Sequence, residues 1–256
     1  MRIGIFCFRN DLRLHDNRAL LTALDACDRL HLVYVFEDRL WRESATHRIS
    51  THRARFILES LQCLIEQINN RGGGLNIIYG NIELSIPQFM DKHRAEICFL
   101  SQESAWEENK TEEALSKVVP TTLASNPTLI HPNDLPFALS ELPETFTQFR
   151  KKVEKKWIVR PCLTLPKSLN SCDSTHANLP TLSDLGFFNN TLDPRSCFTF
   201  CGGSSSGQNR IKNWLWDKQC LSTYKLTRNE MTGADFSSRL SPWLSTGCLS
   251  PRAIYE

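Results

Sequence analysis

The sequence predicts an α/β protein: a doubly wound, five-stranded parallel sheet, then a long connector, then the start of an all-α region. Two observations support this. Short apolar runs alternate with helical periodicity through the first 132 residues, and helical periodicity returns only after "FCGGSSSG". Continuous apolar strands that alternate with helices are typical of a sheet covered on both faces. We therefore divide the chain into an α/β domain at 1–132, a connector at 133–205 and a helical region at 206–256.

The predicted strands are short runs rich in branched apolar residues, at 2–8, 30–36, 75–80, 96–100 and 128–132. The clearest predicted helix covers 51–70, where apolar residues recur at spacings of three and four. It ends at "NNRGGG", a strong helix stop before the next strand.

The connector is rich in Pro, Asn, Ser and Asp, which favour turns. One short helix, "TFTQFRKKVEKKW", interrupts it. Its basic residues would suit a nucleic acid, with Trp157 available for stacking, or they form an ordinary solvated helix face. These residues are Lys151, Lys152, Lys155 and Lys156. In the helical region, Ser241 and Pro242 fit an N-cap followed by proline at the first position of a helix.

Composition narrows the class of protein. Ten cysteines include no CxxC, and Cys197 and Cys201 lack a histidine at zinc-like spacing, so we expect neither a disulfide nor a metal site there. No signal peptide and no apolar stretch of about 18 residues is found, so we expect no membrane association. A net charge of +2 does not by itself indicate nucleic acid. A reduced, cytoplasmic protein is predicted, with an organelle or the nucleus left open.

Polar side chains follow the first and the fourth predicted strands. Arg9 follows the first and Glu103 the fourth, and carboxyl ends of parallel strands meet at a ligand crevice. No GxGxxG is present, which disfavours a Rossmann dinucleotide site. Taken alone, the stretch around Arg9 also fits a turn with an internal Arg–Asp pair before a helix capped near Asp16, and Glu103 also fits a structural role. The later glutamates of the helix after Glu103, Glu112 among them, are expected to be solvated.

The stretch "TYKLTRNEMTGADFSSRLSPW" places three hydroxyl groups around one guanidinium at the opening of a helix. Hydroxyls, a guanidinium and free helix N–H groups all suit phosphate oxygens, whereas a plain cap needs one serine. The sequence therefore predicts a pyrophosphate cradle formed by Ser237, Ser238, Arg239 and Ser241, with Tyr224 upstream.

The pairing of "FRNDLRLHDN" with the distal "YKLTRNEMTGADFSSRLSPWLSTGCLSPRAIYE" resembles the photolyase/cryptochrome family, with the best fit to its DASH cryptochrome branch. The segments "NDLPF", "FTQFRK", "NLPTLSDLGF" and "FCGGSSSG" occur in the same order, so the resemblance covers essentially the whole chain. Ser204 departs from it, since DASH-like sequences generally carry glutamate there. Family members are roughly twice as long, so we expect the helical domain to be cut short at Glu256.

The resemblance implies a photolyase-type antenna domain and a helical domain that binds FAD. Residues that match the FAD-contact motif are Tyr224, Ser237, Ser238, Arg239, Leu240 and Ser241. Glu103 matches the carboxylate that binds the pterin of a 5,10-methenyltetrahydrofolate antenna, and Arg9 falls near that site. The implied activity is that of a deoxyribodipyrimidine photolyase. The complete protein would repair cyclobutane pyrimidine dimers, mainly in single-stranded UV-damaged DNA, by photoinduced electron transfer from reduced FAD.

Two alternatives stay open: a light-sensing cryptochrome without repair activity, and a truncated nucleotide- or pterin-binding α/β module. The catalytic groups are expected beyond Glu256, so this chain alone is expected to be inactive. We also expect the start of the helical region to leave an apolar face uncovered unless it folds back or associates, and hence to favour oligomers or aggregates. That face would include Trp214, Leu215, Trp243 and Leu244.

Overall fold

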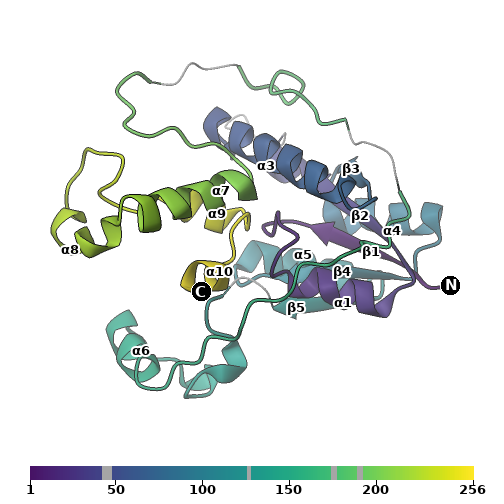
Figure 1. Ribbon diagram of the computed structural model, residues 1–256. Coiled ribbons are helices and arrows are strands. Elements are labelled where there is room, and N and C mark those ends of the chain that lie inside the picture. The colour runs from purple at the N-terminus through teal and green to yellow at the C-terminus, as the bar shows by residue number, and fades with distance from the viewer. Residues whose placement is uncertain (42–47, 126–127, 174–177, 189–192) are drawn as a thin grey trace.

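The computed structural model describes residues 1–256 except 42–47, 126–127, 174–177 and 189–192. Five strands form one sheet in the order β3-β2-β1-β4-β5, and every pairing is parallel (Figure 1). The predicted doubly wound, five-stranded fold is confirmed. The strands are β1 (Ile3–Phe8), β2 (Arg29–Phe36), β3 (Leu75–Tyr79), β4 (Ile97–Gln102) and β5 (Thr121–Ser125).

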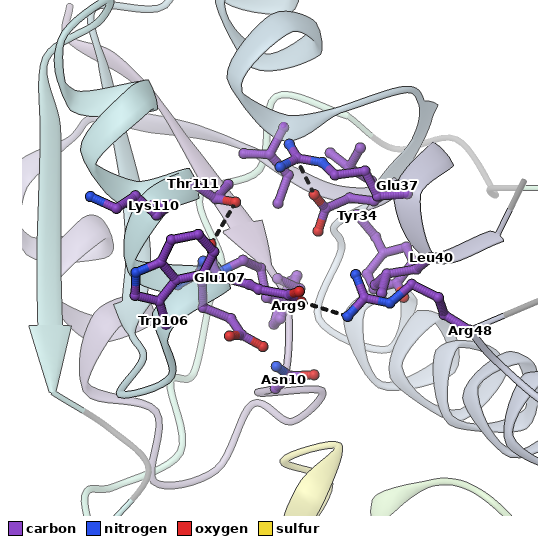
Figure 2. A pocket seen from close by; sticks show the side chains of 15 residues that line it. Arg9, Asn10, Tyr34, Glu37, Leu40, Arg48, Trp106, Glu107, Lys110 and Thr111 are labelled. Carbon is purple, nitrogen blue, oxygen red and sulfur yellow. Dashed lines mark hydrogen bonds and ion pairs between the residues drawn. The ribbon is translucent and has the colours of Figure 1, made fainter. Parts of the chain in front are cut away.

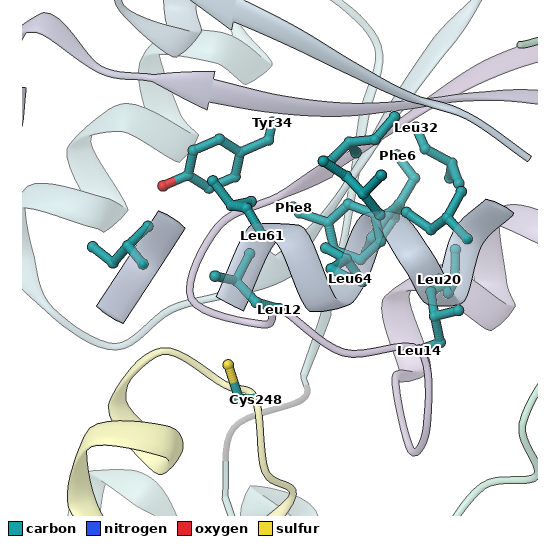
Figure 3. Close-up of a cluster of buried hydrophobic side chains, with 14 of the residues drawn as sticks. Phe6, Phe8, Leu12, Leu14, Leu20, Leu32, Tyr34, Leu61, Leu64 and Cys248 are labelled. Atoms are coloured by element: carbon teal, nitrogen blue, oxygen red, sulfur yellow. The ribbon is translucent and has the colours of Figure 1, made fainter. Parts of the chain in front are cut away.

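Helices cover both faces of the sheet, because successive strand side chains point to opposite sides. Phe6 and Phe8 of β1 belong to one buried cluster, which also takes in the apolar faces of α1 and α3 (Figure 3). Ile5 and Cys7 belong to a second cluster, which they share with α4 and α5. The bounds of these helices are α1 (Arg18–Ala26), α3 (Thr51–Asn69), α4 (Ile82–His93) and α5 (Trp106–Ser116); the short α2 covers Asp38–Trp41.

The fifth strand lies elsewhere than predicted. It runs over Thr121–Ser125 and pairs with β4 from Cys98 to Gln102, whereas 128–132 is a bend that leads into a 3-10 turn. The reason is local. His131 caps that turn by accepting the Asn133 N–H at 3.2 Å, and Pro132 has no N–H to give to a sheet. The strand predicted at 128–132 was therefore wrong.

Two predicted helix starts are corrected by one residue. Asn17, rather than Asp16, caps α1 by accepting the Leu20 N–H at 3.1 Å. Helix α9 (Ser241–Ser245) includes Ser241 as its first residue, and its N-cap is Leu240. The helix predicted at 51–70 is confirmed as α3, and Gly72, with φ of +71°, follows its end.

The connector packs along the sheet for part of its length. Leu30 of β2 donates its N–H to the Asn170 carbonyl at 2.9 Å, and its carbonyl accepts from the Cys172 N–H at 2.8 Å. This parallel bridge lies beside the start of β2, where β3 has not yet begun to pair. The connector also carries the helix α6 (Phe146–Val153), which projects away from the sheet (Figure 1).

The C-terminal segment folds back on the α/β domain, and α7 packs against α3. Trp243 is 2% exposed and meets the ring of Phe56 at 5.7 Å, while Trp214 is 4% exposed. The two tryptophans are covered because the segment folds back, which is the exception that the prediction allowed; Leu215 is only half-buried and Leu244 is exposed. The segment comprises α7 (Ser204–Ile211), a π-helical turn (Lys212–Asp217), a 3-10 turn (Cys220–Ser222), α8 (Tyr224–Thr227), α9 and α10 (Pro251–Tyr255).

Candidate functional site

A cavity of about 450 Å³ opens at the carboxyl ends of β1 and β2. Trp106 and Lys110 of α5 face Tyr34, Glu37 and Leu40 across it (Figure 2). The strand order changes direction between β1 and β4, and ligands of open α/β sheets bind outside the carboxyl ends at such a switch point. The cavity is thus at the predicted crevice.

Arg9 lines this cavity, as its position after β1 predicts. Its guanidinium donates to the Ser101 carbonyl at 2.5 Å and to the carboxylate of Glu112. The side chains of Arg9 and Glu112 are only 8% and 5% exposed. Within its own segment, the backbone N–H of Arg9 donates to the Asp11 carboxylate at 2.8 Å. The charge partner of Arg9 is therefore Glu112, and Nε of Arg9 has no partner among the described residues.

Glu103 lies beside the cavity and is not among the residues that line it, which corrects the expectation that it lines the crevice. Its side chain lies near Asn10, which does line the cavity. Burial raises the pKa of the Glu103 carboxyl to about 7; Asp11 and Glu108 act in the same direction, while Arg9 and Asn10 oppose them. A carboxyl of this kind is half ionised near neutral pH.

Four residues of this region were not singled out from the sequence. Glu37 follows the carboxyl end of β2, the same signal that identified Arg9 and Glu103. The pKa of Glu37 is raised, and burial is the main cause. Tyr34 near the end of β2 is buried, whereas Trp106 at the start of α5 is 73% exposed. Glu112 is 4% exposed, so its expected place on a solvated face was wrong.

The segment predicted to cradle a pyrophosphate lies in the turn before α9. Arg239 takes a left-handed backbone conformation, with φ of +56°. Its guanidinium donates to the Gly233 carbonyl at 2.7 Å, so it does not close on the serine hydroxyls. The carbonyls of Ser237 and Ser238 accept from Arg210, at 3.0 and 2.9 Å. Arg210 thus holds the turn, a role that no sequence motif indicates.

Donors in this turn nevertheless suit an oxyanion. Nε of Arg239 is buried without a partner among the described residues. Within the same described part of the chain, the hydroxyls of Ser237, Ser238 and Ser241 make no hydrogen bond. Unpaired N–H and O–H groups that cluster in one turn fit phosphate oxygens.

The two remaining residues of the motif have different surroundings. Leu240 is 8% exposed and belongs to the main apolar cluster, so its side chain serves the core. Tyr224 begins α8, and its ring lies 5.9 Å from that of Trp214. The indole N–H of Trp214 donates to the Asp235 carbonyl at 2.8 Å. Trp214 therefore links Tyr224, which contacts its ring, to the segment just before the turn.

The basic residues of the α6 segment are exposed. Lys151, Lys152, Lys155 and Lys156 all lie on the surface, and Lys152 stands over the ring of Phe137 at 5.4 Å. Trp157 is 44% exposed beside them. Exposure of these residues is compatible both with a nucleic-acid patch and with an ordinary solvated helix face.

Cys197 and Cys201 are exposed thiols. Across the described ranges, no group of three or more His, Cys, Asp or Glu side chains could hold a metal ion. Outside the four gaps, no helix combines the length and apolar character that crossing a bilayer requires.

Comparison with known proteins identifies relatives over the whole chain. Cryptochrome DASH of Gloeobacter violaceus is 37% identical over 257 residues, covering 97% of this chain and 51% of the relative. Cryptochrome DASH of Synechocystis sp. is 38% identical over 260 residues, covering 97% and 53%. The chain thus spans about half the length of the curated relatives it matches.

Solved structures agree in fold. A Synechocystis sp. cryptochrome matches with a TM-score of 0.90 at 35% identity, covering 100% of this chain and 55% of that one. A bacterial class III photolyase from Agrobacterium tumefaciens has the same fold, with a TM-score of 0.80 at 21% identity, over 100% of this chain and 52% of that one. The family model described as DNA photolyase matches residues 5–167, more than half of the chain. The chain therefore belongs to the DNA photolyase family.

Proposed function

We propose that this chain is the antenna domain and FAD-phosphate segment of a DASH-like blue-light flavoprotein. The complete protein would repair cyclobutane pyrimidine dimers, mainly in single-stranded DNA, by photoinduced electron transfer. The observation that carries this proposal is the match to a Synechocystis sp. cryptochrome over the full chain, with a TM-score of 0.90 at 35% identity. The match includes both the crevice and the turn before α9.

The turn before α9 would hold the FAD pyrophosphate. Its donors would be the hydroxyls of Ser237, Ser238 and Ser241 and the Nε of Arg239, which has no partner in the part of the chain that the structure describes. Arg210 keeps the turn in place through the carbonyls of Ser237 and Ser238. When bound, reduced FAD supplies the electron for repair, and a folate antenna supplies absorbed light.

Glu103 would bind the pterin of a 5,10-methenyltetrahydrofolate antenna. An ionised carboxylate accepts from the amino and ring N–H groups of a pterin. Glu103→Gln should weaken folate binding by roughly 1–3 kcal/mol, the usual cost of an unmatched buried hydrogen bond. Glu141→Gln, an exposed site on a 3-10 turn, is the control and should bind normally. Equal folate affinity of the two variants would show that Glu103 does not bind the folate.

Flavin content tests the FAD assignment. The pyrophosphate is only the middle of FAD, and the flavin ring and adenine need apolar walls. We expect the monomeric 256-residue chain to bind FAD weakly or not at all, and a chain extended through a helical domain to purify yellow. An extended, folded chain without flavin contradicts the proposed function. Stoichiometric, dialysis-resistant FAD on the 256-residue chain would show instead that the half-site suffices.

One observation favours a second candidate, a self-contained pterin-binding module. Trp214 and Trp243 are buried against this chain's own residues, as a stand-alone protein requires. Such a module would bind folate tightly without flavin. A light-sensing cryptochrome would differ from both by binding flavin and leaving pyrimidine dimers unrepaired under blue light.

The compartment is a proposal as well. We propose a cytoplasmic location, and the names of two relatives define the alternative. The DASH cryptochromes of Solanum lycopersicum and Arabidopsis thaliana are named chloroplastic/mitochondrial. Fluorescence microscopy of the tagged protein in its own cells distinguishes the two.

A further inference from the structure

We propose that Glu112 is a positioning residue for the ligand contact of Glu103, a role that rests on the proposed function of Glu103. One oxygen of the Glu112 carboxylate, Oε1, binds two groups. It accepts from the Arg9 guanidinium and, at 2.9 Å, from the backbone N–H of Glu103. Glu112 belongs to α5, Arg9 follows β1 and Glu103 follows β4, so a single atom ties three elements together at the crevice.

The surrounding contacts make this tie rigid. Arg9 also donates to the carbonyl of Ser101, the penultimate residue of β4, at 2.5 Å. The hydroxyl of Ser101 donates to Asp11, which lies in the loop after β1. The ends of β1 and β4 are thereby joined at the switch point, two residues before Glu103. These contacts fix the direction of the Glu103 backbone. The Glu103 side chain is half-buried near Asn10.

Glu112 also controls the charge that Glu103 meets. Arg9 is a cation next to Glu103, and an unbalanced cation at this position would hold the Glu103 carboxyl in its ionised form. Glu112 forms an ion pair with Arg9 and, by our proposal, weakens the effect of that cation on Glu103. Arg9 still lowers the pKa of Glu103, but burial dominates and the pKa is about 7. The other charged groups that act on Glu103 are Asp11 from the β1 loop and Glu108 from α5, and both raise this pKa further.

The consequence is a contact that changes character near neutral pH. Ionised Glu103 accepts two hydrogen bonds, as the amino and ring N–H edge of a pterin offers them; protonated Glu103 can accept fewer and donates one. Binding of such an edge should therefore weaken as pH falls below about 7. Glu112 sets where on the pH scale this happens.

Titration of Glu103 in the ligand-free protein tests the proposal. Its carboxyl carbon can be followed by 13C NMR, with the signal assigned by its loss in Glu103→Gln. Glu112→Gln keeps an oxygen for the Glu103 N–H and removes the charge that balances Arg9. We expect it to lower the Glu103 midpoint by at least about one pH unit. Glu113→Gln is the matched control, because Glu113 is exposed and paired with Lys110, and it should leave the midpoint unchanged.

Arg9→Gln supplies a second variant with the opposite sign. It leaves the Glu112 carboxylate unbalanced, so the Glu103 midpoint should rise, and the Arg9→Gln/Glu112→Gln double variant should restore it. A purely structural role would not produce opposite shifts that cancel. An unchanged Glu103 midpoint in folded Glu112→Gln, or in folded Arg9→Gln, would overturn the proposal.

Folate binding separates this inference from the proposed function. The pH profile of 5,10-methenyltetrahydrofolate binding, measured by its fluorescence, should move to lower pH in Glu112→Gln. If the NMR midpoints shift while no variant binds folate at any pH, the coupling is supported and the proposed antenna role of Glu103 fails. If folate binds and the profiles of wild type and Glu112→Gln coincide, Glu112 has no part in the contact.

Discussion

Asp16 and Arg252 form a buried ion pair across 236 positions of sequence, with hydrogen bonds of 2.9 and 2.5 Å. The Asp16 carboxylate also accepts the Ser250 hydroxyl and, at 2.9 Å, the Leu163 N–H. Burial alone would raise the pKa of Asp16, but the Ser250, Leu163 and Arg252 contacts outweigh it and lower the pKa. One carboxylate thus joins the β1–α1 loop, the connector and the C-terminal segment.

Removing the Arg252 charge should be strongly destabilising. Arg252→Met leaves the buried Asp16 carboxylate without its ion-pair partner, which typically costs about 3–5 kcal/mol. Urea unfolding at pH 7 measures this loss. Because the folded pKa of Asp16 is below its ordinary 3.8, the stabilisation is present above that value and is lost as pH falls through the folded pKa. The difference from wild type should therefore narrow in acid.

Arg195→Met is the control for this prediction. Arg195 forms an ion pair with Asp193, but its side chain is 88% exposed. Exposed pairs contribute little to stability, so the urea midpoint should not move. Equal losses in the two variants would mean that burial of the Asp16–Arg252 pair is irrelevant.

Gly247 and Gly72 offer a second matched pair. Both have a positive φ, of +67° and +71°. A Cβ on Gly247 would lie 2.0 Å from the Asn10 carbonyl oxygen, whereas a Cβ on Gly72 would meet nothing within 4 Å. Gly72→Ala should cost about 1 kcal/mol of backbone strain. Gly247→Ala should cost several times more, because backbone atoms must separate, and limited proteolysis should then release the C-terminal segment. Similar unfolding midpoints for both variants would contradict the close approach.

Glu103 should make stability depend on pH. Its folded pKa of about 7 exceeds the ordinary 4.5, so between these values the folded protein binds more protons than the unfolded chain. Stability contributed by this group is therefore present at low pH and is lost as pH rises through 7. Glu103→Gln does not titrate, so it should gain stability relative to wild type by roughly 1–3 kcal/mol between pH 5 and 8. Urea unfolding at several pH values measures this gain, and a pH-independent difference would refute it.

Self-association is still expected, on a different surface from the one predicted. Three strongly exposed apolar side chains lie on the π-helical turn, on α8 and in the turn that follows: Trp216 is 70%, Leu226 80% and Met231 93% exposed. Leu226→Glu should reduce oligomers in sedimentation velocity, because charge on an apolar patch opposes contact. Leu84→Glu, at a 61% exposed position on α4, is the control and should have no effect. A wild-type chain that stays monomeric at all concentrations would contradict the prediction.

The strands that are buried on both faces could be predicted, because their apolar runs are continuous. The edge strand β5 could not. Its sequence Thr-Thr-Leu-Ala-Ser is only half-buried, and the stronger apolar run at 128–132 lies just beyond it. Sheet pairing with β4 decided between the two, and a local pattern does not contain that information.

The site was predictable where strand order alone places a side chain. Arg9 and Glu103 follow strand ends, and the structure places Arg9 in the lining of the cavity and Glu103 beside it. Glu112 was not predictable, because its burial depends on Arg9 crossing from another strand. Asp16 and Arg252 likewise meet through tertiary packing, and neither residue type nor spacing indicates a partner 236 positions away.

The close approach of Gly247 to Asn10 has a consequence for spectroscopy. Leu12 and Arg13 donate to the Thr246 and Gly247 carbonyls, at 3.1 and 2.8 Å, so the loop below the crevice and the turn after α9 move as one body. Excitation transfer between two pigments depends steeply on their separation and relative orientation. With one pigment at the crevice and one at the α9 turn, the contact between the loop at 10–13 and the turn at 246–247 would set both the separation and the orientation. Lengthening the connector should therefore leave the efficiency of excitation transfer unchanged. Gly247→Ala, which separates the two backbone segments, should lower that efficiency.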